Sequence, residues 1–288
     1  MSPNLTGALL MVASLACFTV NDTMLKLTGG DVPVFQLLFV RGLMTCGLIL
    51  ATKGRLGDIH FRIKRRDWWV IAARAMAEVT IAFFFLQALL NMPLANVTAI
   101  MQVVPLMVTL ASAVILRERV GWRRMLAIGV GFCGVMLIVK PGAEGFNVWS
   151  LYALIAVMAV TIRDLVTRKL SEQVPSMSVT LITALAVTGA SGLASLGTPW
   201  VSISGGNSVL IAASAILVLG GYFFSIQVMR TGDVSFTAPF RYTGLVWALL
   251  LGWFAFGEWP SSVTLLGAAI VAGTGMFTFY RERLLSRR

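Results

Sequence analysis

The stretch Thr19-Val20-Asn21-Asp22 returns 142 residues later as Thr161-Ile162-Arg163-Asp164. A basic residue follows each aspartate at the same distance, as Lys26 in the first copy and Arg168 in the second. The spacing holds without a gap between these positions. It indicates an internal repeat, and a repeat constrains the architecture of the whole chain before any single residue does.

A second pair of residues has nearly the same spacing. Glu118 and Glu258 lie 140 residues apart, and each follows one apolar stretch and precedes another. We therefore predict two related halves, residues 5–140 and 148–281. Duplicated halves in a membrane protein are typical of transporters.

The composition is that of a protein that lies in lipid. Apolar residues make up 58% of the chain and charged residues 12%, about half of the charged fraction of a soluble protein. A membrane helix needs roughly 17–25 apolar residues. Ten stretches meet this requirement, namely Leu5–Lys26, Val34–Ala51, Trp68–Leu90, Ala95–Leu116, Trp122–Val139, Trp149–Leu170, Met177–Leu196, Val209–Met229, Thr237–Phe256 and Ser262–Tyr280. We predict an all-α integral membrane protein with ten transmembrane helices.

Basic residues are distributed unevenly among the predicted loops. Seventeen Lys and Arg follow the even-numbered helices, and only Lys26 and Lys140 lie on the other side. Because positive loops stay in the cytoplasm, both termini are predicted to be cytoplasmic and the protein to cross the cytoplasmic (inner) membrane several times. The net charge of +11 then reflects topology and does not indicate a nucleic-acid partner.

Five helices in each half is an odd number, so the two halves are predicted to be inverted relative to one another. A pseudo-two-fold axis in the membrane plane would relate them. Inverted repeats supply two near-equivalent packings, one open to each side of the membrane. This pattern favours a secondary carrier with alternating access. A channel, a membrane-embedded enzyme and an assembly factor without transport activity remain the alternatives.

The junctions between helices carry a family resemblance. The residues concerned are Pro105, Leu116-Arg117-Glu118-Arg119-Val120-Gly121-Trp122, Gly129, Gly131 and Gly134, then Phe256-Gly257-Glu258-Trp259-Pro260, Gly267, Gly273 and Gly275. The chain resembles the EamA branch of the drug/metabolite transporter superfamily over essentially its whole length. The resemblance implies a carrier of amino acids, nucleosides, vitamins, drugs or other metabolites, in either direction. Riboflavin carriers and S-adenosylmethionine carriers are both candidates.

Some charged residues inside the predicted helices have no charged counterpart in the other half. A charge in the membrane is costly, so it faces a cavity or a partner. Fold maintenance tends to preserve the symmetry of a repeat, whereas a ligand site tends to break it. The candidate substrate-binding residues of this kind are Arg41, Arg74, Glu78, Arg163 and Arg241.

Arg241 is the strongest of these candidates. It follows Pro239, where the helix loses a backbone hydrogen bond and can kink, and Tyr242 and Trp247 lie in the same stretch. Gln102 lies in the corresponding helix of the first half. An arginine beside aromatic rings and an amide suits a planar or anionic metabolite, and we lean towards a planar vitamin such as riboflavin.

The repeated segments supply candidates for gating or coupling. These are Asp22 and Lys26 near the outer face, and Asp164 and Arg168 near the inner face. The alternative is that each aspartate pairs within its own helix with the basic residue four positions along, and that Arg74 pairs with Glu78 in the same way. Glu118 and Glu258 are expected to cap the next helix.

The sequence offers little support for catalysis. Gly189-Ala190-Ser191-Gly192 resembles a serine-protease motif, but the chain's one histidine, His60, lies in a loop and not in a predicted helix. No phosphate-binding loop is present. We expect no cofactor and no metal site. The partners expected are a small-molecule substrate and membrane lipid, with the coupling ion open and a proton as one candidate.

Overall fold

The computed structural model describes most of the chain, and all structural statements concern the described residues. These are residues 3–52, 54, 59–61, 63–115, 121–139, 147–171, 173–231 and 237–286. Glu118, Lys140 and the junction residues 116–120 lie outside them.

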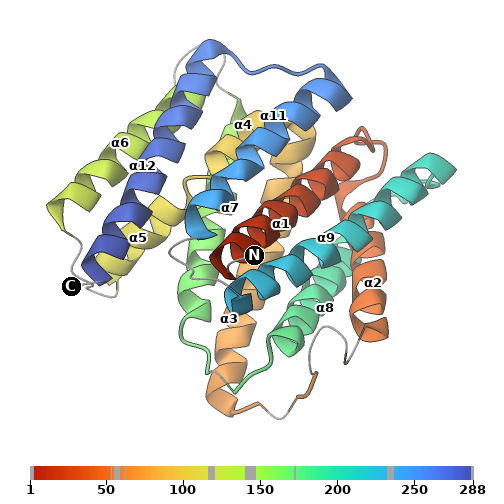
Figure 1. Cartoon of the computed structure of the whole chain (residues 1–288). Helices are drawn as coiled ribbons and strands as arrows, with labels where there is room; N and C mark the ends of the chain where they lie inside the picture. Colours follow the sequence, from red (N-terminus) through yellow and green to blue (C-terminus); the bar gives the residue numbers. More distant parts are fainter. Residues whose placement is uncertain are drawn as a thin grey trace.

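All regular secondary structure in the described chain is helical, and Figure 1 shows the helices from the N-terminus in red to the C-terminus in blue. In chain order they are α1 (Pro3–Lys26), α2 (Val34–Ala51), α3 (Arg65–Asn91), α4 (Leu94–Met101), α5 (Val104–Ile115), α6 (Trp122–Val139), α7 (Val148–Thr167), α8 (Ser176–Ser195), α9 (Gly205–Thr231), the 3-10 helix η1 (Ala238–Tyr242), α11 (Thr243–Phe256) and α12 (Ser262–Ser286).

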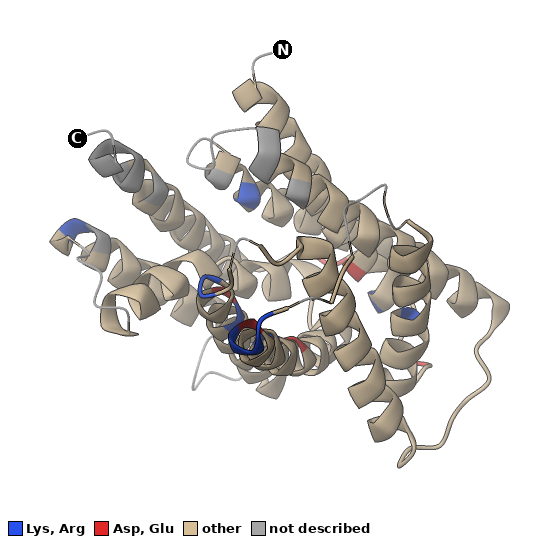
Figure 2. Cartoon of the chain, turned by 90° about the horizontal axis from the view of Figure 1, so that it is seen from below, with Lys and Arg blue, Asp and Glu red and all other residues tan. Residues whose placement is uncertain are grey.

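Seven described segments are long and apolar enough to cross a membrane: α1, α2, α3, α4 with α5, α7, α8, and α9 as far as Ser225. The helices α6 and α12 contain shorter apolar segments, Met125–Val139 and Ser262–Thr278. Figure 2 colours Lys and Arg blue and Asp and Glu red, and most of the ribbon is tan because its residues are uncharged. Large apolar side chains such as Leu196 and Phe254 are exposed on the surface of the bundle. The protein is therefore a multi-pass membrane protein.

Local sequence explains where several helices begin and end. Pro33 and Pro175, which occupy matching places in the repeat, directly precede α2 and α8. The Asn147 side chain accepts a hydrogen bond from the Trp149 backbone N–H at 3.0 Å and caps α7. Gly257 ends α11 with a φ of 64°, a left-handed conformation that glycine adopts without steric cost.

Two of the predicted continuous helices are broken. The fourth stretch divides into α4 and α5 around Gln102, and Pro105 lies in the first turn of α5. The ring of a proline clashes with the carbonyl four residues earlier, here that of Met101, where α4 ends. The ninth stretch begins as the 3-10 helix η1 with Pro239 in its first turn and continues as α11.

Helices of the first half pack against helices of the second. The most extensive contacts join α1 with α9, α2 with α8, α3 with α7 and α6 with α12. In Figure 1, α6 and α12 lie side by side at one edge of the bundle, and α2 and α8 lie towards the opposite edge. No pair in this set joins neighbours in the sequence, so each pair connects the two halves of the chain.

Glycines allow the close contact between α6 and α12. A Cβ atom added to Gly134 would lie 2.8 Å from the Gly267 carbonyl oxygen, and one added to Gly267 would lie 2.5 Å from the Gly134 oxygen. Neither position has room for a side chain. Small residues that let two helix backbones approach closely are common at helix contacts in membrane proteins.

Candidate functional site

A cavity of about 510 Å³ lies between the two halves. This volume is within the range of small-molecule sites, roughly 300–1,000 Å³. Its lining combines apolar side chains with polar and charged ones. The charged and amide residues are Asn21, Asp22, Arg41, Arg74, Glu78, Gln102, Arg163 and Arg241.

The cavity brings together most of the predicted substrate-binding residues. Arg41, Arg74, Glu78, Arg163, Gln102 and Arg241 all line it. Two predicted neighbours of Arg241 do not. Tyr242 is 7% exposed and packs against Gly275 of α12, and Trp247 lies half-buried on α11 outside the lining. The helical rotation that directs Arg241 into the cavity turns the next residue away from it.

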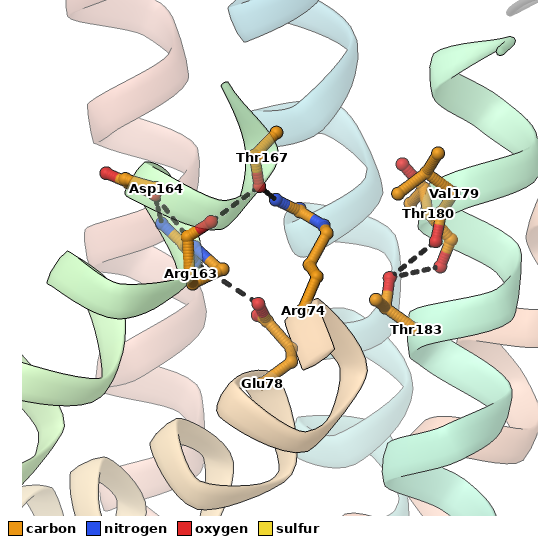
Figure 3. Close-up of polar contacts among 8 residues, drawn as sticks. All are labelled: Arg74, Glu78, Arg163, Asp164, Thr167, Val179, Thr180 and Thr183. Atoms are coloured by element: carbon orange, nitrogen blue, oxygen red, sulfur yellow. Dashed lines mark hydrogen bonds and ion pairs between the residues drawn. The ribbon is translucent and has the colours of Figure 1, made fainter. Parts of the chain in front are cut away.

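Arg163 of α7 holds two carboxylates, as Figure 3 shows. Its Nη1 donates to Glu78 Oε2 of α3 at 3.3 Å, and its Nη2 donates to Asp164 Oδ1 at 2.9 Å. The expected pairs within single helices are therefore wrong for both acids. Glu78 pairs across helices instead of with Arg74, and Asp164 pairs with its neighbour.

Arg74 and Arg168 both donate hydrogen bonds to hydroxyl groups. Arg74 Nη1 donates to Thr167 Oγ1 at 2.6 Å (Figure 3). Arg168, the predicted gating residue of the second half, donates from Nη1 to Ser112 Oγ of α5 at 3.1 Å and does not line the cavity.

A chain of hydrogen bonds starts from the repeated segment in α1. Asn21 Nδ2 donates to Asp22 Oδ1 at 2.8 Å. Asn21 Oδ1 accepts from Arg41 Nη2 at 3.1 Å and from Ser214 Oγ of α9 at 2.8 Å. The amide thus connects α1, α2 and α9, and the charges of Asp22 and Arg41 interact electrostatically across it.

Lys26 forms a cluster with Glu258, not with Asp22 as predicted. Its Nζ lies 2.8 Å from Glu258 Oε1 and also donates to the Met92 carbonyl oxygen. Glu258 Oε2 accepts the backbone N–H of Leu94 at 3.1 Å, and the Phe256 ring lies 5.0 Å from Lys26 Nζ. These contacts join the ends of α1, α3, α4 and α11 next to Leu25, which lines the cavity.

Glu258 is a capping residue, but for a different helix from the one predicted. It binds the first N–H of α4, from the other half of the chain. The next helix in sequence, α12, is capped by Ser261, whose Oγ accepts the Thr264 N–H at 3.3 Å. A serine directly before the helix satisfies the local cap, so the glutamate is available for a distant one.

Sequence reasoning missed the aromatic part of the cavity. Phe18, Phe85 and Tyr222 line it. The Phe18 and Tyr222 rings meet edge to face with centroids 5.4 Å apart. Gly221 was the feature of the sequence that could have indicated this contact. A Cβ at this position would lie 2.7 Å from the Phe18 ring, so only glycine leaves room for the ring where α9 meets α1.

The two helix breaks meet in the cavity. Gln102, at the break between α4 and α5, donates from Nε2 to the Arg241 carbonyl oxygen in η1 at 3.4 Å. Thr98 and Pro105, near the first break, also line the cavity. Discontinuous helices that place polar groups at the centre of the membrane are characteristic of transporter substrate sites.

Membrane-spanning helices around a charged central cavity define a membrane transport protein. A family model described as the EamA-like transporter family matches residues 5–140 and 147–280. The chain belongs to this family, and its resemblance to the drug/metabolite transporter superfamily is confirmed.

Curated relatives match over nearly the whole chain. The S-adenosylmethionine uptake transporter of Rickettsia felis is 27% identical, covering 97% of this chain and 94% of the relative. The riboflavin transporter of Vibrio cholerae is also 27% identical, covering 99% and 96%. A protein crystal structure with 23% identity has the same fold, with a TM-score of 0.66 and coverage of 96% of this chain and 97% of that one.

Proposed function

We propose that the protein is a secondary carrier that moves a small organic metabolite across the cytoplasmic membrane by alternating access. In this proposal residues 5–140 and 148–281 are inverted repeats of five membrane helices, and both termini are cytoplasmic. The proposal rests mainly on the cavity between the halves, in which the helix breaks at Gln102 and Arg241 meet. The pairing of helices across the halves supports a two-fold arrangement.

The Lys26–Glu258 ion pair is proposed as the outer gate. With both termini in the cytoplasm, the end of α1 that carries Lys26 faces outwards. The pair ties this end to the start of α4 and the end of α11. In this conformation the contact closes the outer side, and its opening would let substrate pass. Asp22, which lines the cavity beyond this gate, is the proposed coupling residue.

The relatives suggest two substrate classes for this cavity. The names of the relatives give S-adenosylmethionine and riboflavin, and both compounds combine a flat ring system with polar groups. The rings of Phe18, Phe85 and Tyr222 offer stacking surfaces, and the arginines and acids offer charged hydrogen bonds.

Flux in proteoliposomes tests the carrier proposal. Purified full-length protein is reconstituted into liposomes, and labelled S-adenosylmethionine or riboflavin is added outside without ATP. We expect uptake of one compound above that of protein-free liposomes, with counterflow when the same compound is loaded inside. Flux that appears only after an ATPase is added would contradict a secondary carrier.

A further inference from the structure

The charges that line the cavity are not balanced. Arg41, Arg74, Arg163 and Arg241 line it together with two acids, Asp22 and Glu78. Arg163 forms ion pairs with Glu78 and with Asp164. Asp164 lies outside the lining. The other three arginines form no ion pair within the described chain. The cavity therefore has unpaired positive charge.

Two of these arginines also have buried N–H groups without an acceptor. The Nε atoms of Arg41 and Arg74 are buried and make no hydrogen bond within the described chain. Buried polar groups are nearly always hydrogen-bonded, so each exception requires an explanation. Because both side chains line the cavity, the missing acceptors can come from a molecule bound there.

Neighbouring groups hold both guanidinium groups in place by hydrogen bonds, and neither group forms an ion pair among the described residues. Arg41 donates one N–H to Asn21, and Arg74 donates one to Thr167. Glu78, one turn from Arg74 on α3, is held by Arg163 (Figure 3). A carboxylate that would otherwise neutralise Arg74 is thus occupied by a third arginine.

Tyr222 of α9 adds a hydroxyl group to the cavity that Arg41 and Arg74 line. Its side chain also lines the cavity, where its ring meets that of Phe18 edge to face. The two arginines, from α2 and α3, therefore line the same cavity as a tyrosine hydroxyl from α9. A guanidinium group binds the paired oxygens of a carboxylate or phosphate by parallel hydrogen bonds.

We propose that Arg41 and Arg74, with the Tyr222 hydroxyl, form a subsite for an anionic oxygen group of the transported metabolite. The proposal rests on the proposed function and narrows its substrate class to molecules that bear a carboxylate or a phosphate. A neutral compound leaves both arginines unpaired. The anionic group would replace the missing acceptors, while the remainder of the molecule contacts the rings of Phe18 and Phe85.

Matched probes that differ by one anionic group test this subsite. S-adenosylmethionine is compared with its decarboxylated analogue, and riboflavin 5′-phosphate with riboflavin, by equilibrium binding to purified full-length protein. We expect the anionic member of at least one pair to bind about tenfold more tightly than its partner, which corresponds to one charge-assisted contact. The first pair tests whether the subsite binds a carboxylate, and the second pair tests whether it binds a phosphate.

Substitutions of Arg41 and Arg74 test whether these side chains cause the difference in affinity within a probe pair. Arg41→Gln and Arg74→Gln should each reduce the ratio within the discriminating pair to about threefold or less. Arg123→Gln is the matched control, because Arg123 is exposed and lies outside the cavity; its ratio should not change. If a Gln variant does not fold, Arg74→Lys should weaken the anionic probe selectively, because lysine lacks the guanidinium fork.

The subsite is overturned if no anionic probe binds, if both members of each pair bind equally, or if the variants keep the tenfold ratio. Equal weakening of both members by Arg74→Lys also overturns it. These outcomes differ from failure of the carrier proposal, which is an absence of ATP-independent flux. A protein that transports riboflavin and riboflavin 5′-phosphate equally well would still be a carrier, but it would lack this subsite.

Discussion

Lys26 and Glu258 are 232 residues apart in the sequence, yet Nζ of one and Oε1 of the other lie 2.8 Å apart. The same glutamate binds the backbone N–H of Leu94. One carboxylate from the second half thus connects the end of α1 to the start of α4, both of which belong to the first half. The Lys26 side chain is only 9% exposed, so water screens this contact less than it screens a surface ion pair.

Replacement of Glu258 by glutamine should destabilise the protein. The substitution leaves the Lys26 ammonium without its carboxylate, and we expect a loss of roughly 1–3 kcal/mol, the cost typical of a lost charged hydrogen bond. Thermal unfolding in detergent measures this effect. Lys169→Gln, at an exposed position, is the control, and equal midpoints for both variants would contradict a stabilising role.

Arg241→Ala should abolish transport and leave the fold intact. The side chain is exposed in the cavity lining and makes no ion pair within the described chain, so its removal should change stability by about 0.5 kcal/mol or less. Flux in proteoliposomes is expected to fall at least about tenfold if the side chain makes a charged contact to substrate. Unchanged flux in a folded variant would remove Arg241 from the site.

The contact between α6 and α12 should not tolerate a methyl group at Gly134. Because the added Cβ would lie 2.8 Å from the Gly267 carbonyl oxygen, Gly134→Ala is expected to cost roughly 1–3 kcal/mol through overpacking. Gly129→Ala in the same helix is the matched control, since a Cβ there meets nothing within 4 Å. The two unfolding midpoints should differ, and similar values would argue against close backbone packing.

The proposed orientation can be tested by labelling. In a chain whose native cysteines are replaced, Arg65→Cys should be protected from a membrane-impermeant thiol reagent in intact cells, and Lys140→Cys should react. This follows from the excess of basic residues in the loops on the side of Arg65. The opposite labelling pattern would reverse the topology and place the Lys26–Glu258 pair at the cytoplasmic end.

The length of apolar stretches located several helices because it follows directly from residue type. The stretch Val34–Ala51, for example, is the predicted span and also the observed α2. Asymmetry of charge between the halves also identified residues that line the cavity, among them Arg41 and Arg163. A charge in the membrane needs a cavity or a partner, and this requirement can be read without coordinates.

Ion partners could not be predicted in the same way. Asp164 and Arg168 have the spacing of an intrahelical pair, but Asp164 pairs with Arg163, and Arg163 also reaches Glu78 on another helix. The relative rotation of α3 and α7 decides this choice. Tyr242 shows the same dependence, since rotation about η1 turns it to Gly275 while Arg241 lines the cavity.

The sequence by itself determined that the chain lies in a membrane, that its segments repeat and which charges are exceptional, because hydropathy and spacing are properties of residues in order. Only the tertiary structure decided that Lys26 binds Glu258, that Glu78 is held by Arg163 and that two arginines of the cavity lining have a buried Nε without an acceptor in the described chain. Contacts of a few ångströms depend on how helices rotate and cross, and residues distant in sequence specify that packing jointly.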